Sequence, residues 1–211
     1  MRRLPIYLLL DTSGSMSGEP IEAVKNGVQL LETTLKQDPY ALETAYISVI
    51  TFDASAQQVT PLTEVVQFQS PVIQAGGQTS LGHALSLLAE RIEVEVKKNT
   101  PTEKGDWKPM VFLMTDGEPT DDWYAGLQRL QQVKTGTIVA CAAGMQANTG
   151  ILQQITECVV QLDSANADTI RAFFKWVTQS IAVSSQHVDA NHEVGSMGDL
   201  PPPPPAINVI S

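Results

Sequence analysis

An unbroken apolar run that stops at a carboxylate is the feature that most constrains this chain. Residues Ile6–Leu10 are followed at once by Asp11, and then by Thr-Ser-Gly-Ser. Such a run is typical of a strand that is buried on both faces, as in the parallel sheets of α/β proteins. The sequence therefore favours an α/β fold in which Asp11 stands at the carboxyl end of a buried strand.

Strand-like runs alternate along the chain with segments whose apolar residues recur at helical spacing. Further strands are expected at 45–52, 57–61, 110–115, 137–142 and 159–162, and helices at 21–35, 81–92, 123–130, 151–156 and 170–181. This alternation predicts a doubly wound, mainly parallel sheet of six strands with helices on both faces, a Rossmann-like arrangement. The run 57–61 ends in a proline and is expected to be a short antiparallel edge strand.

The composition changes near the end of the expected last helix. We expect one folded domain over residues 1–184 and a proline-rich C-terminal tail over 185–211. Pro201–Pro205 is an unbroken proline run, which favours the polyproline II conformation. The sequence favours a stiff spacer or end segment here over a peptide that docks on a partner or on the protein's own surface.

Oxygen-bearing side chains gather where two of the buried strands end. After the first strand, Asp11, Ser13 and Ser15 can point their oxygens at one spot as the chain turns, and such ligands suit a hard cation such as Mg²⁺. The run 110–115 ends in Asp116, and Thr79 follows a Gly-Gly turn just before an expected helix. In doubly wound folds the ligand crevice lies beyond the carboxyl ends of the strands. If the strands that precede Asp11 and Asp116 are neighbours, these residues share that crevice.

The order D-x-S-x-S, Gly-Gly-x-Thr and Asp-Gly resembles the metal-ion-dependent adhesion site (MIDAS) of the von Willebrand factor A (vWA) domain family. The resemblance covers roughly residues 3–184. It implies a vWA fold in which Ser13, Ser15 and Thr79 are hydroxyl ligands of the ion, while Asp11 and Asp116 bind it directly or through water. Because this ligand set is entirely oxygen, we expect Mg²⁺ or Mn²⁺ in preference to Ca²⁺. The resemblance implies a module that binds proteins offering an acidic side chain to the metal.

Within that family the chain resembles the bacterial tellurite-resistance proteins. The similarity lies in the start of the chain, in Ser48–Asp53, in Val111–Asp121 and in the proline-rich end. It implies a scaffold or regulator in a stress response, with a kinase-like protein and a phosphatase as partners.

The net charge and the lengths of the apolar runs limit the kinds of partner and the cellular location that we expect. The net charge of −10 argues against nucleic acid and against anionic membrane surfaces. No apolar run approaches about 20 residues, and the first run meets Asp11 too early for a secretory signal, so a cytoplasmic location is expected. Cys141 and Cys158 are expected to be buried free thiols.

The sequence supports an enzyme less well than it supports a binding protein. A haloacid-dehalogenase-type phosphatase would place a second Asp two positions after Asp11, where this chain has Ser13. There is no G-x-S-x-G elbow or P-loop, and three histidines without a Cys or His cluster make a zinc site a poor fit. His83 and Asp53 are expected to be structural. We therefore expect a protein that is not an enzyme, and a metal-dependent phosphohydrolase is the alternative.

Overall fold

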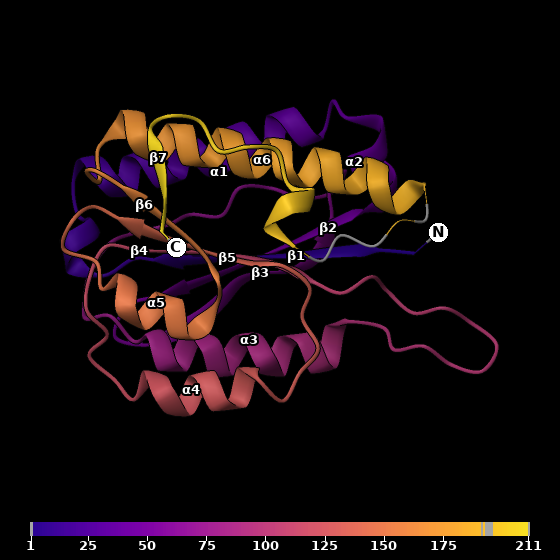
Figure 1. The fold of residues 1–211 in the computed structure, drawn as a ribbon, viewed down its shortest axis with the longest axis horizontal. Coiled ribbons are helices and arrows are strands. Elements are labelled where there is room, and N and C mark those ends of the chain that lie inside the picture. The colour runs from indigo at the N-terminus through magenta and orange to yellow at the C-terminus, as the bar shows by residue number, and fades with distance from the viewer. Residues whose placement is uncertain (1, 191, 193–195, 211) are drawn as a thin grey trace.

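Strand β1 (Leu4–Asp11) lies near the middle of one mixed sheet that is flanked by two layers of helices (Figure 1). We describe the protein from a computed structural model, which covers residues 2–190, 192 and 196–210. The sheet has seven strands in the order β3-β2-β1-β4-β5-β6-β7. The other strands are β2 (Ala45–Phe52), β3 (Ala56–Glu64), β4 (Met110–Thr115), β5 (Ile138–Ala143), β6 (Cys158–Leu162) and β7 (Ile207–Ile210). The five strands from β2 to β6 in this order run parallel, and the outermost strands β3 and β7 pair antiparallel.

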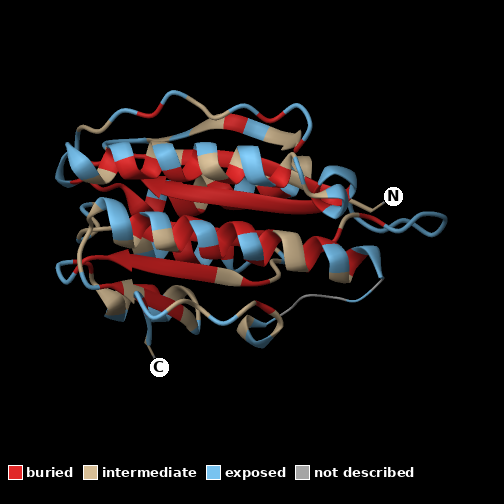
Figure 2. Ribbon diagram, turned by 90° about the horizontal axis from the view of Figure 1, so that it is seen from above, coloured by how far each residue is buried: buried red, intermediate tan, exposed pale blue. Residues whose placement is uncertain are grey.

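The helices form two layers, one on each face of the sheet (Figure 1). Helices α1 (Glu19–Leu35), α2 (Pro39–Thr44) and α6 (Ala167–Asp189) cover one face, and α3 (Leu81–Glu95), α4 (Trp123–Leu130) and α5 (Thr149–Ile155) cover the other. Side chains of β1 alternate between the layers: Ile6 and Leu8 belong to the cluster with α1 and α6, whereas Tyr7 and Leu9 belong to the cluster with α3 and α4. Both faces are covered, so β1 is buried along its whole length (Figure 2). This explains why its sequence is continuously apolar.

Helices α3 and α4 touch through their backbones. A Cβ atom built on Gly126 would lie 2.3 Å from the Gly82 carbonyl oxygen, and one on Gly82 would lie 2.3 Å from the Asp122 carbonyl oxygen. Only glycine permits this approach. The contact fixes the start of α3 against the start of α4, and both helix starts follow loops of the candidate site.

The C-terminal segment packs on the protein itself and adds a strand that the sequence did not lead us to expect. Val160 of β6 pairs with Val209 of β7 in antiparallel register. Before β7, the Trp176 indole Nε1–H of α6 donates to the Pro201 carbonyl oxygen at 2.7 Å, and Leu200 and Ile207 are buried. The expected mainly parallel α/β fold is therefore confirmed, with seven strands instead of six because the tail supplies the last one.

Other expected elements differ in extent. The edge strand β3 runs to Glu64, past the exposed Pro61, which an edge strand tolerates because one side of its backbone is unpaired. The short helix α2 was not expected. Helix α6 continues through residue 184 to Asp189. The division into a domain at 1–184 and a tail at 185–211 stays a prediction.

Candidate metal centre

The candidate site lies between β1 and β4, where the order of the strands in the sheet reverses. The chain passes from β1 to β2 on one side of β1 and returns through α3 to β4 on the other side. Leu10 of β1 is in register with Met114 of β4, so the next residues, Asp11 and Thr115, stand side by side at the carboxyl ends. This is the switch point at which doubly wound folds place their ligand crevice.

A chain of hydrogen bonds joins the residues of the first turn to Asp116. Asp11 Oδ1 accepts from the Ser13 backbone N–H at 2.8 Å, and the Ser13 and Ser15 hydroxyl oxygens lie 3.0 Å apart. The Ser15 hydroxyl donates to Asp116 Oδ1 at 2.7 Å. Asp11 Oδ2 accepts a 2.6 Å bond from the hydroxyl of Thr115. Both carboxylates and both serine hydroxyls therefore lie together at the carboxyl ends of the neighbouring strands β1 and β4.

The Gly-Gly turn brings Thr79 to the same spot. Gly76 N–H donates to the Thr12 carbonyl at 2.8 Å, and Gly77 accepts a 3.0 Å bond from Gly14 N–H, so this loop is attached to the turn after β1. Gly77 has φ +76°, a left-handed conformation that favours glycine. A Cβ built on Gly117 would lie 3.8 Å from the Thr79 Oγ1 atom, which places that hydroxyl beside the residue that follows Asp116.

Thr120 and Asp121, in the loop that follows β4, hold Thr79 and the start of α3 in place. Thr120 N–H donates to the Thr79 carbonyl at 2.9 Å, and Thr79 N–H donates back to Thr120 Oγ1 at 3.3 Å. The Asp121 carboxylate accepts from the Gly82 and His83 backbone N–H groups at 3.0 and 2.9 Å, so it caps α3 from another part of the chain. The loop that carries Asp116 and the loop that carries Thr79 are thus held as one unit.

The electrostatics of the site suit a divalent cation. Asp11 is 0% exposed, and burial raises its pKa, aided by repulsion from Asp116 and opposed by hydrogen bonds from Ser13 and Thr115. Burial also raises the pKa of Asp116, which is half-buried. Two carboxylates that are costly to keep charged, bridged by serine hydroxyls, form an all-oxygen donor set of the kind that hard cations bind. Within the described residues there is no group of three or more His, Cys, Asp or Glu side chains that could hold a metal, so hydroxyl ligands would be needed.

The structure thus brings the five predicted positions, Asp11, Ser13, Ser15, Thr79 and Asp116, to one edge of the sheet. That they bind a metal stays a prediction.

The sequence did not reveal the supporting residues Thr115 and Thr120 or the capping role of Asp121. Thr115 could have been found, because it precedes Asp116 at the end of a buried strand, whereas the Asp121 contact depends on the packing of α3 on α4. The Asp53 carboxylate accepts from Ser55 N–H, which fits the role of a structural turn residue expected for it, whereas the structural role expected for the exposed His83 stays a prediction.

Comparison with known proteins identifies the family. The family model of the von Willebrand factor type A domain matches residues 6–179, which is most of the chain. The chain belongs to the von Willebrand factor type A domain family. The matched range includes all five candidate ligand positions of this vWA domain.

Solved structures show the same fold at low sequence identity. The pilus adhesin SpaC from Lactobacillus rhamnosus GG superposes with a TM-score of 0.67 at 16% identity, covering 87% of this chain and 31% of that chain. Proximal thread matrix protein 1 from the mussel byssus, in a structure with a zinc-occupied MIDAS motif, gives a TM-score of 0.59 at 20% identity, covering 87% and 46%.

Among curated proteins, the uncharacterized protein sll0103 of Synechocystis sp. is 34% identical over 124 residues, or 56% of this chain and 26% of that protein. This vWA domain therefore spans about a quarter of that relative's length and less than half of those two structures.

Two further expectations concern membranes and thiols. Across the described residues, no helix combines the length and hydrophobicity that crossing a membrane requires. Cys141 and Cys158 are both free, as the sequence predicts. Cys141 is buried, as expected, which raises the pKa of its thiol well above the ordinary value. The expected burial is wrong for Cys158, which is only half-buried at the start of β6.

Proposed function

We propose that this vWA domain is a metal-dependent protein-interaction module. The observation that carries the proposal is the shared site of Asp11, Ser13, Ser15 and Asp116, with the Thr79 hydroxyl beside it, at the switch point of the sheet. The zinc-occupied MIDAS of the mussel byssus protein supports a divalent ion at such a site. Mg²⁺ or Mn²⁺ is our preferred ion in this protein, because its ligand set is entirely oxygen.

The residues at the site suggest how a partner is held. Three hydroxyls and one or two carboxylates leave an octahedral ion open to a further ligand. A bound cation with so few formal charges around it supplies an electrophilic point for an acidic side chain of the partner. Ser15 is exposed and Asp116 half-buried, so this point faces solvent, whereas Asp11, Ser13 and Thr79 are buried and hold the geometry.

Apolar side chains near the same edge give the partner further contacts. Met145 follows β5 at the carboxyl end of the sheet and is 69% exposed. Val72, in the segment that leads to the Gly-Gly turn, is 85% exposed. Exposed apolar residues that flank a polar anchor are typical of protein interfaces.

We infer that the protein is not an enzyme. Asp11 is buried and already accepts two hydrogen bonds, which makes it a poor nucleophile. The purified protein should release no phosphate from p-nitrophenyl phosphate or from nucleotides in the presence of Mg²⁺. Sustained hydrolysis that disappears in Asp11→Ala would favour the metal-dependent phosphohydrolase instead.

The cellular context is a further part of the proposal and rests on the resemblance to the tellurite-resistance protein TerY. On that basis the protein is a cytoplasmic scaffold or regulator in a bacterial stress response, with a kinase-like protein and a phosphatase as partners. The two free cysteines are consistent with a reducing compartment.

A pull-down from the native host tests the proposal directly. Tagged protein is incubated with lysate in Mg²⁺ or in EDTA, and the captured proteins are compared. We expect specific partners that are lost in EDTA and in Thr79→Ala but retained in the matched control Thr33→Ala, whose hydroxyl is exposed on α1. High salt should weaken capture less than EDTA does, because a metal–carboxylate bond is screened less than surface charge pairs. Partners that survive EDTA unchanged would refute the mechanism.

A further inference from the structure

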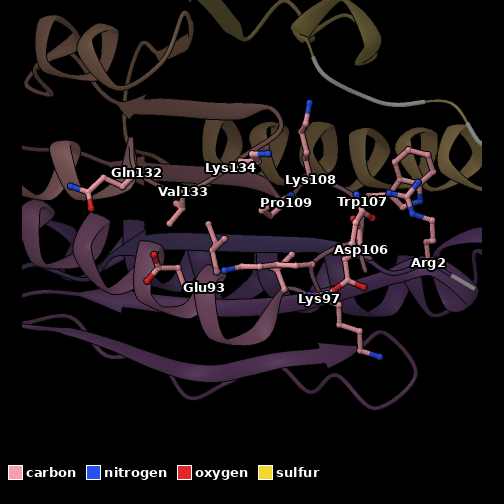
Figure 3. Close-up of a pocket in the computed structure, with 14 residues that line it drawn as sticks. Arg2, Glu93, Lys97, Asp106, Trp107, Lys108, Pro109, Gln132, Val133 and Lys134 are labelled. Carbon is pink, nitrogen blue, oxygen red and sulfur yellow. Dashed lines mark hydrogen bonds between the residues drawn. The ribbon is translucent and has the colours of Figure 1, made fainter. Parts of the chain in front are cut away.

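A basic pocket lies at the end of the sheet opposite the candidate metal centre (Figure 3). It has a volume of about 690 Å³ and sits beside Pro109, which precedes β4, and beyond the last turns of α3 and α4. The lining residues are Arg2, Ile92, Glu93, Val96, Lys97, Lys98, Asn99, Asp106, Trp107, Lys108, Pro109, Gln132, Val133 and Lys134. This volume falls within the range of about 300–1,000 Å³ that is usual for ligand sites.

Positive charge dominates this pocket although the whole chain is strongly acidic. Five lysine or arginine side chains line it against two carboxylates, Glu93 and Asp106. Both carboxylates already pair with arginines that do not line the pocket: Asp106 with Arg3, and Glu93 with Arg129. Even without Lys108, the remaining cations Arg2, Lys97, Lys98 and Lys134 give the pocket an excess of positive charge in a protein whose net charge is −10.

One of these cations is held in place before any ligand arrives. Arg2 Nε–H donates to the Gly105 carbonyl at 2.8 Å, and its guanidinium carbon lies 3.7 Å from the centre of the Trp107 ring. An arginine fixed by hydrogen bonds and stacking loses little conformational entropy when it binds a carboxylate. In Figure 3 Arg2 and Trp107 lie at one end of the pocket, away from Lys134.

The distribution of charge distinguishes an extended ligand from a compact one. Phosphate groups are usually bound by converging donors at a helix N-terminus. Here the chain leaves the C-terminal ends of α3 and α4, whose partial negative charge disfavours a concentrated anion. The cations instead line the pocket together with three apolar side chains, Ile92, Val96 and Val133. Spaced carboxylates alternating with apolar side chains complement this surface better than a phosphate does.

We propose that this pocket binds an acidic, partly apolar segment of a partner protein, as a second docking point at the opposite end of the sheet from the candidate metal centre. The two docking points depend on different interactions. The first depends on a divalent ion, whereas this pocket depends on charge complementarity and on burial of apolar side chains. Binding at the pocket should therefore be insensitive to EDTA and should weaken steeply with salt.

The test uses a fluorescein-labelled peptide of alternating glutamate and leucine, followed by fluorescence anisotropy with the full chain. All titrations contain EDTA, so that a carboxylate of the peptide cannot be captured by an ion at the metal centre. We expect saturable binding that is lost in a peptide with glutamine in place of glutamate. The double variant Lys97→Gln/Lys134→Gln should bind the acidic peptide about tenfold more weakly.

The matched control is Lys25→Gln/Lys175→Gln, which makes the same charge change on α1 and α6. It should alter the dissociation constant by less than about twofold. Absence of binding in EDTA, or equal weakening by both double variants, would overturn the proposal. Inorganic phosphate or ATP that displaces the peptide and binds more tightly than it would also overturn it, since the pocket would then be a small-anion site. None of these outcomes depends on the metal centre.

Discussion

Replacing Asp11 by asparagine removes the charge of this residue. The amide nitrogen that takes the place of Oδ2 cannot accept from the Thr115 hydroxyl, which has to turn and accept from the amide instead. Asparagine keeps the size of the side chain and a carbonyl oxygen that can accept from the Ser13 backbone N–H. It removes a buried negative charge that lies close to Asp116. In metal-free protein we therefore expect unchanged or higher thermal stability, because burying an unpaired charge is costly. In the presence of Mg²⁺ or Mn²⁺ we expect the variant to gain nothing.

The size of the effect follows from mass action. An ion present at a hundred times its dissociation constant stabilises the native state by about 2.7 kcal/mol. For a chain of 211 residues, 1 kcal/mol changes Tm by about 2–4 °C. The native protein should thus melt about 5–11 °C higher with metal than in EDTA. The Asp11→Asn variant should shift by less than about 2 °C under the same conditions.

Differential scanning fluorimetry in EDTA and in increasing Mg²⁺ or Mn²⁺ measures both shifts. Asp53→Asn is a matched control, since Asp53 follows the carboxyl end of the neighbouring strand β2 but lies outside the hydrogen-bonded group of Asp11 and Asp116. This control should keep the full metal response. A full response in Asp11→Asn would remove Asp11 from the site, and no response in the native protein would refute the metal centre itself.

Three further substitutions probe contacts that stabilise the fold. Gly126→Ala should destabilise the protein by about 1–3 kcal/mol in urea unfolding, because its Cβ would overlap the backbone of α3, whereas Gly76→Ala, with nothing within 4 Å, should cost much less. Trp176→Phe removes the indole donor to the tail and should cost about 1 kcal/mol, with faster amide hydrogen exchange in β7. For Glu32→Gln, the relevant quantity is the pKa of the native carboxylate. Burial raises the pKa of Glu32, but hydrogen bonds from Lys36 and Ser70 outweigh this effect and hold the pKa below its ordinary value. Ionised Glu32 therefore stabilises the folded protein at neutral pH, and this stabilisation is lost as pH falls through the lowered pKa. The stability difference between native protein and Glu32→Gln, followed by thermal unfolding, should shrink in acid.

The sequence predicted those parts of the fold that depend on local pattern. The apolar runs before Asp11 and Asp116 are uninterrupted because both faces of β1 and β4 are covered by helices, so their burial could be inferred from composition alone. The topology rule for parallel sheets then placed both carboxylates at one edge. The Gly-Gly turn before Thr79 was also visible, because the left-handed backbone at Gly77 restricts the residue type.

Contacts between distant segments could not be predicted in the same way. The hydrogen bond from Thr115 to Asp11 depends on the register of β4 beside β1, and the cap that Asp121 places on α3 depends on how closely two glycines let the helices approach. The basic pocket collects residues from the N-terminal segment and from the loops after α3 and α4, which no single stretch of sequence displays. The tail was misjudged because four residues after a proline run carry too weak a strand signal.

The antiparallel pairing of β7 has a consequence for how the protein behaves at high concentration. Without it, β6 would present a row of unpaired backbone donors and acceptors beside the buried Val159 and Val160, a template for pairing with another chain. With it, the edge strand on this side of the sheet is β7, which has four residues and follows five prolines that cannot donate backbone hydrogen bonds. A short edge preceded by prolines discourages sheet-to-sheet aggregation. The C-terminal segment therefore protects the solubility of the domain as well as completing its sheet.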